Sequence, residues 1–424
     1  METDLRQLAL ELPGRGVSTD TRTLKQGDIF FALKGPRFDG HDFIEEAVAK
    51  GAWRVVFSDS KKIHSKFEKS AGFLKVRDTL KAYGELAKVY RGQFKIPVVA
   101  VTGSVGKTTV KELLAHLLKK KLNVLKNEGT ENNLVGVPKT ILRLRRGHEV
   151  LVLEMGTNRP GEIGRLSRMA SPTLAILTRV GHSHLEGLNN LEGVREEKLG
   201  ILKGLAAGGI FIVNGEDPSL KEIKSARHRI LRVSFSDRYP MRLIGRDNRL
   251  NGLLAAAAAT ELGIDEGTVR EGLGSFEPVK GRLEEKEIAG IHFINDTYNS
   301  NPVSFKAALE ALQSLETRGK KGVVCGDMLE LGGQAGALHR RMGLLLAEFL
   351  FDFVIAAGPL SAALVDEAVK NGFDSSRIRH VKNAEDAGAL CREWASAGDR
   401  VLVKGSRGMK MEKVFECFIT SFTR

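Results

Sequence analysis

The part of this sequence that most constrains its fold is an apolar run at residues 98–101 followed by Thr-Gly-Ser-Val-Gly-Lys-Thr-Thr at 102–109. The run of small and β-branched residues is typical of a buried strand, and the apolar spacing of residues 110–118 is typical of a helix. A glycine turn between a strand and a helix brings backbone N–H groups and the positive end of a helix dipole to one anion. The sequence therefore predicts a phosphate-binding loop at this position.

The spacing of this loop departs from the standard phosphate-loop motif, because Val101 stands where the first glycine belongs. Lys107 is expected to reach the terminal phosphates of ATP, and the Thr108 hydroxyl is expected to ligate Mg²⁺. An ordinary glycine turn before a helix is the alternative. The loop residues predicted to contact ATP are Gly103, Ser104, Val105, Gly106, Lys107, Thr108 and Thr109.

The chain has 424 residues, of which 42% are hydrophobic and 28% charged, and this length is enough for two or three globular domains. A net charge of +13 would suit a nucleic-acid binder. However, the basic residues are interspersed with acids, and no basic stretch is rich in aromatic residues. A basic surface that serves polyphosphate ligands explains the charge as well, so we expect no nucleic-acid partner.

The features that this sequence lacks limit the cellular compartment that we expect for the protein. Neither a basic leader followed by an apolar segment nor an apolar run near the roughly 20 residues of a membrane span is evident. The three cysteines are too scattered for a disulfide framework or a zinc site. We therefore expect a monomer in a reducing cytoplasm, without membrane insertion.

Residues 1–93 are predicted to form a first unit of short strands with a helix at 44–50 and a further strand at 53–57. Small polar residues around one arginine at 17–22 would suit a sugar or a phosphate. Loops of this composition are more often plain turns. The residues alone leave both interpretations open.

Strands and helices alternate from residue 96 to about 278, which predicts a parallel sheet with right-handed crossovers. Ligands of such sheets bind at the carboxyl ends of the strands, where Glu154, the loop 130–133 and the loop 181–186 lie. For each of these a solvent-exposed acid or a plain turn remains the alternative, and Lys198 looks like part of a solvated helix face. The predicted strands are 98–101, 150–154, 174–177 and 209–213, and the predicted helices are 107–120, 135–144, 161–169 and 191–205.

An alanine-rich helix that ends at Leu262 carries Asn248 and Asn251 in its first turn. A linker with proline and glycine follows at 276–282, and then a second alternating unit begins. Polar clusters at 296–302, 326–332 and 404–407 suggest a second binding face, or plain turns. The predicted strands are 293–295, 322–325, 353–356 and 400–403, and the predicted helices are 304–315, 338–349, 360–370 and 411–418.

Together these motifs resemble those of the Mur ligases, the ATP-dependent amide ligases that build the peptidoglycan precursor. The resemblance covers essentially the whole chain in the right order and implies three α/β domains. These are a small UDP-substrate-binding domain at 1–93, a central ATP-binding parallel sheet at 94–280 and a Rossmann-like domain at 281–424. The motifs that carry the resemblance are the phosphate loop, Thr130–Asn133, Glu154–Gly156, Gly181–Gly187, Glu197–Lys198, Asp20–Arg22, Phe30–Gly35, Asp39–His41, Tyr298–Pro302, Gly326–Gly332 and Val403–Arg407.

Within the family, the last three motifs are similar to the branch that adds D-alanyl-D-alanine to UDP-N-acetylmuramoyl-tripeptide. The resemblance implies that ATP phosphorylates the terminal carboxylate of the tripeptide, and that the dipeptide amine then displaces phosphate. It implies Lys107, His184 and Lys198 as catalytic residues and two Mg²⁺ ions. Thr108 and Glu154 would bind the first ion, and His184 with a carbamylated Lys198 would bind the second.

The resemblance also implies contacts for ATP and for the two other substrates. Asp247 departs from the family, where a histidine is usual at the start of that helix. The implied nucleotide contacts outside the loop are Asn248, Arg282, Asn299 and Asn301. The implied substrate contacts are Ser18, Asp20 and Arg22 for the uridine diphosphate, Asn132 and Asn133 for the sugar or peptide, and Asp327, Lys404 and Arg407 for the incoming amine and the peptide carboxylates.

Two other functions compete with this interpretation. One is a related ligase that adds the third amino acid of the tripeptide, or a folate polyglutamate synthetase, and the run Tyr298–Pro302 argues against both. The other is a nucleotide-gated switch or a nucleic-acid-binding ATPase, which would bind DNA or RNA with steep salt dependence.

Overall fold

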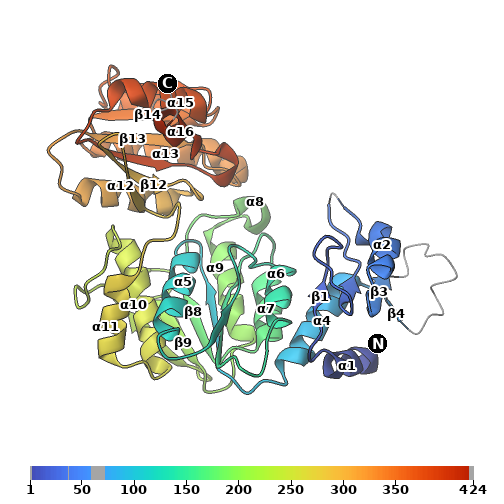
Figure 1. Ribbon diagram of the computed structural model, residues 1–424. Helices are drawn as coiled ribbons and strands as arrows, with labels where there is room; N and C mark the ends of the chain where they lie inside the picture. The colour runs from blue at the N-terminus through green and yellow to red at the C-terminus, as the bar shows by residue number, and fades with distance from the viewer. Residues whose placement is uncertain (1, 37, 59–71, 420–424) are drawn as a thin grey trace.

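The computed structural model describes residues 2–36, 38–58 and 72–419, and they form three α/β units, each built on its own sheet (Figure 1). Figure 1 shows the blue N-terminal unit beside the central unit and the orange-to-red C-terminal unit above the central one. The three predicted α/β domains are therefore confirmed as a fold class.

The N-terminal unit contains a four-stranded parallel sheet in the order β1-β2-β3-β4. Alternate strand residues face opposite sides, so Phe30 packs towards α2 while Phe31 packs against Tyr83 of α4, with ring centroids 5.0 Å apart. The sequence analysis did not identify α1 or α4. The elements are α1 (Glu2–Glu11), β1 (Val17–Ser18), β2 (Ile29–Phe31), α2 (Ile44–Ala49), β3 (Arg54–Ser58), β4 (Phe73–Val76) and α4 (Thr79–Arg91).

The central unit is a six-stranded, wholly parallel sheet in the order β10-β9-β8-β5-β7-β6. Residues of β5 alternate between two cores, one under α5, α10 and α11 and the other under α6, α7 and α9. The elements are β5 (Val98–Thr102), α5 (Lys107–Leu118), β6 (Val124–Lys126), α6 (Gly136–Ile141), β7 (Val150–Glu154), α7 (Glu162–Ala170), β8 (Leu174–Leu177), α8 (Leu185–Leu188), α9 (Leu191–Leu199), β9 (Ile210–Asn214), β10 (Arg229–Val233), α10 (Arg246–Glu261) and α11 (Glu266–Ser275).

The predicted helix at 191–205 is wrong in its length. Helix α9 ends at Leu199, and residues 200–203 form a 3-10 turn. The two glycines of this segment pack closely on α7, because a Cβ on Gly204 would lie 2.1 Å from the Ser167 carbonyl oxygen and one on Gly200 would lie 3.1 Å from the Gly164 nitrogen. Tertiary packing thus overrides the helical periodicity.

The C-terminal unit has a six-stranded sheet in the order β11-β12-β16-β13-β14-β15. All neighbours are parallel except β11 and β12, which pair antiparallel. Helices α12, α13 and α14 cover one face, and α15 with α16 cover the other. The elements are β11 (Glu284–Ile288), β12 (Ile291–Asp296), α12 (Pro302–Ser314), β13 (Lys321–Gly326), α13 (Ala335–Glu348), β14 (Phe353–Ala357), α14 (Ser361–Lys370), β15 (Ile378–Val381), α15 (Ala384–Trp394), β16 (Arg400–Lys404) and α16 (Lys413–Ile419).

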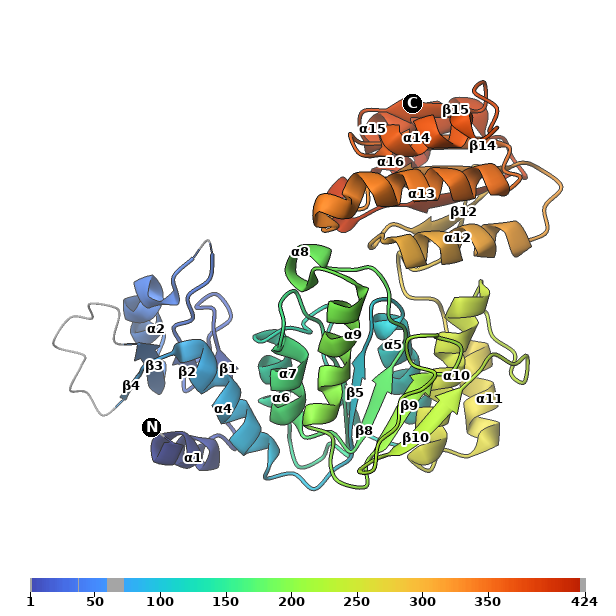
Figure 2. The same ribbon diagram turned by 180° about the vertical axis from the view of Figure 1, so that it is seen from behind.

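The central unit contacts both of its neighbours. Helix α4 packs its apolar face into the same core as α6 and α7. Seen from behind, α8 at the top of the central unit lies beneath the near end of α13 (Figure 2). There the Gln334 Nε2 donates a hydrogen bond of 3.2 Å to the Asn189 carbonyl oxygen. Among the described helices, none is long and apolar enough to cross a membrane.

Candidate active site

A cavity of about 710 Å³ lies at the carboxyl ends of β5 and β7. All three units contribute to its wall, the N-terminal unit through Pro36 and Leu80. Most of the site residues predicted from the sequence line it. They are Ser104, Val105, Gly106, Lys107, Thr108, Thr109, Asn132, Asn133, Glu154, His184, Asn248, Arg282, Asn299, Asn301 and Lys404.

The phosphate loop has the backbone conformation that its glycines allow. Gly106 has a φ of +84°, and a Cβ there would lie 2.4 Å from the Asn251 side-chain oxygen, so only glycine fits. Ser104 fixes the loop to the neighbouring strand end, since its N–H donates to the Arg179 carbonyl oxygen at 2.7 Å. Helix α5 begins directly at Lys107 and directs its N-terminus into the cavity.

Lys107 folds back over this loop. Its Nζ donates to the Gly103 carbonyl oxygen at 2.8 Å and lies 3.4 Å from that of Ser104. Loss of hydration lowers the pKa of Lys107, and the nearby Arg282 lowers it further, while Glu154 raises it. An anion bound by the phosphate loop would give the Lys107 ammonium a stronger hydrogen-bond partner than these carbonyl groups do.

Glu154 lies at the centre of the site with 1% exposure. One carboxylate oxygen accepts a hydrogen bond of 2.8 Å from the Thr108 hydroxyl, and the other accepts one of 2.8 Å from the Asn132 amide. Arg282, from the start of the C-terminal unit, donates to the same Thr108 hydroxyl at 2.8 Å and stacks on Tyr298 with its guanidinium carbon 4.1 Å from the ring centroid. The site therefore joins the phosphate loop to the loop that carries Asn132.

Lys198 is buried inside α9 with no exposure, so the expectation of a solvated helix face is wrong. Its Nζ has no hydrogen-bond partner among the described residues. Burial lowers the pKa of Lys198 well below its usual value; Lys107 lowers it further, while Glu197, Glu154 and Glu162 raise it. Among the described residues, Lys198 is thus a buried amine without a hydrogen-bond partner, next to the site of Glu154 and Lys107.

His184 lines the cavity from a left-handed backbone position, with a φ of +53°. Its Nδ1 lies 2.9 Å from a carboxylate oxygen of Glu330, which belongs to the C-terminal unit and also has a positive φ, +62°. The sequence analysis did not foresee this pair. It ties the loop after β8 to the loop after β13.

Not every predicted residue joins the cavity. Asp327 is buried in the C-terminal unit, where it accepts hydrogen bonds from the Ser361 hydroxyl and N–H at 2.6 and 2.8 Å. Arg407 is exposed and pairs with Glu412 at 3.0 Å. In this arrangement neither lies against the nucleotide loop, and their role as substrate contacts stays a prediction.

The N-terminal residues Ser18, Asp20 and Arg22 form a separate cluster at the end of β1. The Arg22 side chain donates to the Asp20 carboxylate from Nε at 3.0 and 3.1 Å and from Nη2 at 2.6 Å, and the Arg22 backbone N–H donates to it at 2.9 Å. These bonds lower the pKa of Asp20 to about 2. The Ser18 hydroxyl donates to the Asp20 carbonyl oxygen at 2.8 Å. The arginine is exposed, and the role of this cluster as a substrate contact stays a prediction.

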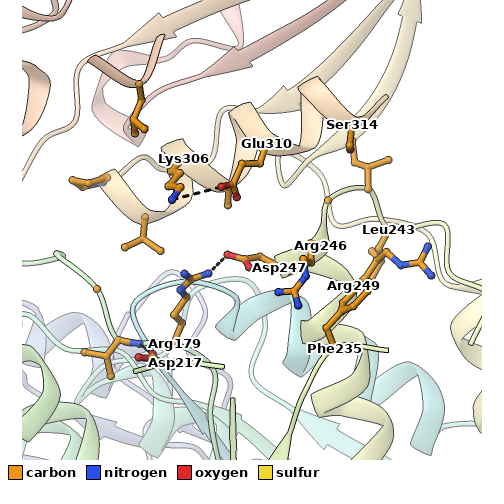
Figure 3. A pocket seen from close by; sticks show the side chains of 18 of the residues that line it. Arg179, Asp217, Phe235, Leu243, Arg246, Asp247, Arg249, Lys306, Glu310 and Ser314 are labelled. Carbon is orange, nitrogen blue, oxygen red and sulfur yellow. Dashed lines mark hydrogen bonds and ion pairs between the residues drawn. The ribbon is translucent and has the colours of Figure 1, made fainter. Parts of the chain in front are cut away.

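A second, larger cavity of about 1220 Å³ separates α10 from α12 (Figure 3). Asp247 lines both cavities and pairs with Arg179, which comes from the loop after β8. Figure 3 shows Lys306 and Glu310 of α12 facing this pair across the opening. The acid at 247 is thus neutralised by an arginine 68 positions away in the sequence.

Several lining residues were missed or unassigned in the sequence analysis. Thr157 and Glu162 follow β7 and hydrogen-bond to one another at 3.2 Å. Asp296 accepts a hydrogen bond of 2.5 Å from Lys404, which is almost fully buried. An available signal was the position of Asp296 at the end of a strand, of Thr157 in the loop after a strand, and of Glu162 in the first turn of the next helix.

The chain was also compared with known proteins. Residues 15–91 match the catalytic domain of the Mur ligase family, residues 101–242 match the Mur ligase middle domain, and residues 281–407 match the Mur ligase glutamate ligase domain. The UDP-N-acetylmuramoyl-tripeptide–D-alanyl-D-alanine ligase of Bacillus subtilis is 36% identical over 96% of this chain and 93% of its own length.

Two similar structures cover almost the whole chain. The MurF structure from Acinetobacter baumannii has a TM-score of 0.88 at 29% identity, over 99% of this chain and 98% of that one. The MurF ligase of Thermotoga maritima in complex with ADP has a TM-score of 0.86 at 30% identity, over 97% and 98%. This likeness therefore includes the order and the arrangement of all three units.

We expect Lys107→Ala to weaken ATP binding by about 10- to 100-fold, the effect of losing one charge-assisted hydrogen bond of about 1.5–3 kcal/mol. Titration calorimetry with ATP and Mg²⁺ measures the change. Lys119→Ala, at the exposed end of the same helix, is the matched control and should bind ATP as the wild type does. Unchanged affinity in a folded Lys107→Ala protein would contradict the placement of phosphates in this loop.

Proposed function

This chain belongs to the Mur ligase family, and we propose that it is the member that joins D-alanyl-D-alanine to UDP-N-acetylmuramoyl-tripeptide. One structural observation carries the proposal in addition to the whole-length similarity. Glu154 accepts hydrogen bonds from both Thr108 and Asn132 in a cavity that all three units line. Such a cavity can bring a nucleotide, a carboxylate and an amine together.

The reaction has two steps. An oxygen of the tripeptide's terminal carboxylate takes the γ-phosphoryl group of ATP, which releases ADP and forms an acyl phosphate. The amine of D-alanyl-D-alanine then attacks the acyl carbon; the carbon–nitrogen bond forms, the bond to phosphate breaks, and the amine loses a proton. The products are the amide, inorganic phosphate and ADP.

The first step requires negative charge to be stabilised on the transferring group. The N–H groups of residues 103–109 and the Lys107 ammonium hold the phosphates at the N-terminus of α5. Arg282 adds a second cation from the C-terminal unit and meets Thr108 there. Asn248, Asn299 and Asn301 border the same cavity, where they are available to the nucleoside.

Thr108 and Glu154 fit a Mg²⁺ ion, because a hydroxyl and a carboxylate oxygen lie 2.8 Å apart at the phosphate loop. Within the described residues, no group of three or more His, Cys, Asp or Glu side chains could hold a metal ion alone. This suits Mg²⁺, which commonly binds through one or two carboxylates together with substrate phosphates and water. Bound there, the ion would neutralise charge on the transferring phosphoryl group.

Lys198 fits a carbamate, since its buried Nζ has no partner and its lowered pKa favours the neutral amine that adds to carbon dioxide. The addition forms a nitrogen–carbon bond and releases a proton. It replaces the amine close to Lys107 by a carboxylate-like group. With His184, this group would provide ligands for a second Mg²⁺.

The three units divide the substrates between them. We assign the UDP-linked substrate to residues 1–93, with Ser18, Asp20 and Arg22 near its diphosphate, and ATP to residues 94–280. Asn132 and Asn133 face the sugar or peptide part. Residues 281–424 receive the amine. Lys404 and Arg407, which pair with Asp296 and Glu412 in this structure, would exchange those partners for carboxylates there.

Lys198→Ala should remove ligase activity, and short carboxylic acids should restore part of it because they supply the missing carboxylate oxygens. Bicarbonate should not restore it, because no amine remains. Phosphate release measures the activity, and Lys203→Ala on the exposed surface nearby is the control. The assignment fails if mass spectrometry of active enzyme, kept under carbon dioxide and never acidified, finds a bare amine at Lys198.

The amine preference tests the proposed function as a whole. The kcat/KM for D-alanyl-D-alanine should exceed that for D-alanine, L-lysine or diaminopimelate at least 100-fold. In a single amino acid the carboxylate lies too near the amine to reach a cation such as Lys404 or Arg407 while the amine is in place to attack. The unpaired cation and the misplaced amine together reduce the stabilisation of the transition state by several kcal/mol.

Phosphate release is measured with each amine at matched concentration and with ATP, Mg²⁺ and UDP-tripeptide saturating. A better rate with L-lysine or diaminopimelate on the UDP-dipeptide would place the chain one step earlier in precursor synthesis. The motifs of the C-terminal unit would then have been misinterpreted.

A further inference from the structure

Lys111 is a buried lysine for which the reaction above has no use. It lies one helical turn after Thr108 on α5, and its side chain has no exposure. Its Nζ donates hydrogen bonds of 3.0 Å to the carbonyl oxygens of Asn127 and Gly129. It also lies 2.9 Å from a carboxylate oxygen of Glu112 and 3.8 Å from one of Glu154. Such a buried charge is retained only where its partners are complete.

The two carbonyl groups belong to the segment 127–133, which we call the asparagine loop. Its first residue, Asn127, is bound to the end of β7, because its amide donates to the Glu154 carbonyl oxygen at 3.0 Å and its side-chain oxygen accepts from the Glu154 N–H at 2.9 Å. Its last two residues, Asn132 and Asn133, line the cavity. Lys111 is therefore the side chain through which α5 holds this loop.

The far end of the asparagine loop approaches Glu154 closely. The Gly156 N–H donates to the Asn132 carbonyl oxygen at 2.7 Å, and a Cβ on Gly156 would lie 2.5 Å from the Asn132 side-chain oxygen. The Asn132 amide bonds to the Glu154 carboxylate. A shift of the loop therefore changes both the cavity wall and the surroundings of Glu154.

We propose that Lys111 is a positioning residue that fixes the asparagine loop against Glu154 and so sets the affinity for the UDP-linked peptide. The proposal rests on the proposed function, in which Asn132 and Asn133 face that substrate. Lys111 touches no substrate itself. D-Alanyl-D-alanine is held by the C-terminal unit, which Lys111 does not contact among the described residues, so the effect of Lys111 falls on the UDP-linked peptide and not on the amine.

The first test is kinetic. Lys111→Met should raise the KM for UDP-tripeptide at least 10-fold and leave the KM for D-alanyl-D-alanine within twofold. Lys120→Met, two residues beyond the end of α5 and paired with the exposed Glu271, is the matched control and should change neither value. A fall in kcat with every KM unchanged would mean a loss of folded enzyme and would overturn the proposal.

A double-mutant cycle separates positioning from general destabilisation. If Lys111 acts through the loop, adding Asn132→Ala to Lys111→Met should raise the KM for UDP-tripeptide no further than the more severe single change does. If the KM increases of the two single variants multiply in the double variant, the two residues act independently, and this would contradict the proposal. Lys111→Gln, which keeps two N–H donors without the charge, should give an intermediate KM, and a KM equal to that of Lys111→Met would count against the role of the two carbonyl bonds.

Hydrogen exchange tests the proposal without any turnover. In Lys111→Met the amides of residues 127–133 should exchange faster, while those of β5 and β8 keep their wild-type rates. Unchanged exchange in the asparagine loop would overturn the positioning role. If wild-type enzyme and variants alike fail to release phosphate with UDP-tripeptide, the proposed function fails, and the exchange result still decides whether Lys111 holds the loop.

Discussion

The buried carboxylate of Glu154 is the constraint on which the rest of this structure depends. Val101 of β5 pairs with Glu154 of β7, so this acid lies beside the last residues of β5, where the phosphate loop begins. Its two oxygens are then shared between Thr108 and Asn132, and Lys111 lies 3.8 Å away. One side chain thereby ties the nucleotide side of the cavity to the substrate side.

Three lysines surround this acid, and two of them respond to it electrostatically. Burial lowers the pKa of both Lys107 and Lys198, and the charge of Lys107 lowers the pKa of Lys198 further. Glu154 opposes the shift in both. An excess of buried positive charge is unfavourable unless anions arrive. Phosphates on the loop and a carbamate on Lys198 would both supply them. The C-terminal unit completes the arrangement through Arg282 on Thr108 and Glu330 on His184.

The phosphate loop and the alternating units could be predicted because their signals are local: a strand, a glycine turn and a helix within twenty positions. Glu154 stood out in the same way, as an acid at the end of an apolar run, whereas the roles of His184, Arg282 and Lys404 came only from the family resemblance. Strand β11 could not, because Glu284–Ile288 is an edge strand whose charged residues hide its pairing with β12. Lys111 and Lys198 resemble surface lysines in sequence, and only packing shows them buried. The Arg179–Asp247 and His184–Glu330 pairs join distant segments, which no periodicity reveals.

The central claim is that this cavity transfers a phosphoryl group to a carboxylate. It is tested most directly with UDP-tripeptide that carries oxygen-18 in its terminal carboxylate, incubated with ATP, Mg²⁺ and D-alanyl-D-alanine. Mass spectrometry of the released inorganic phosphate should find one labelled oxygen per turnover, because the acyl–oxygen bond breaks when the amine attacks. Phosphate without label, formed while the amide product accumulates, would contradict the account.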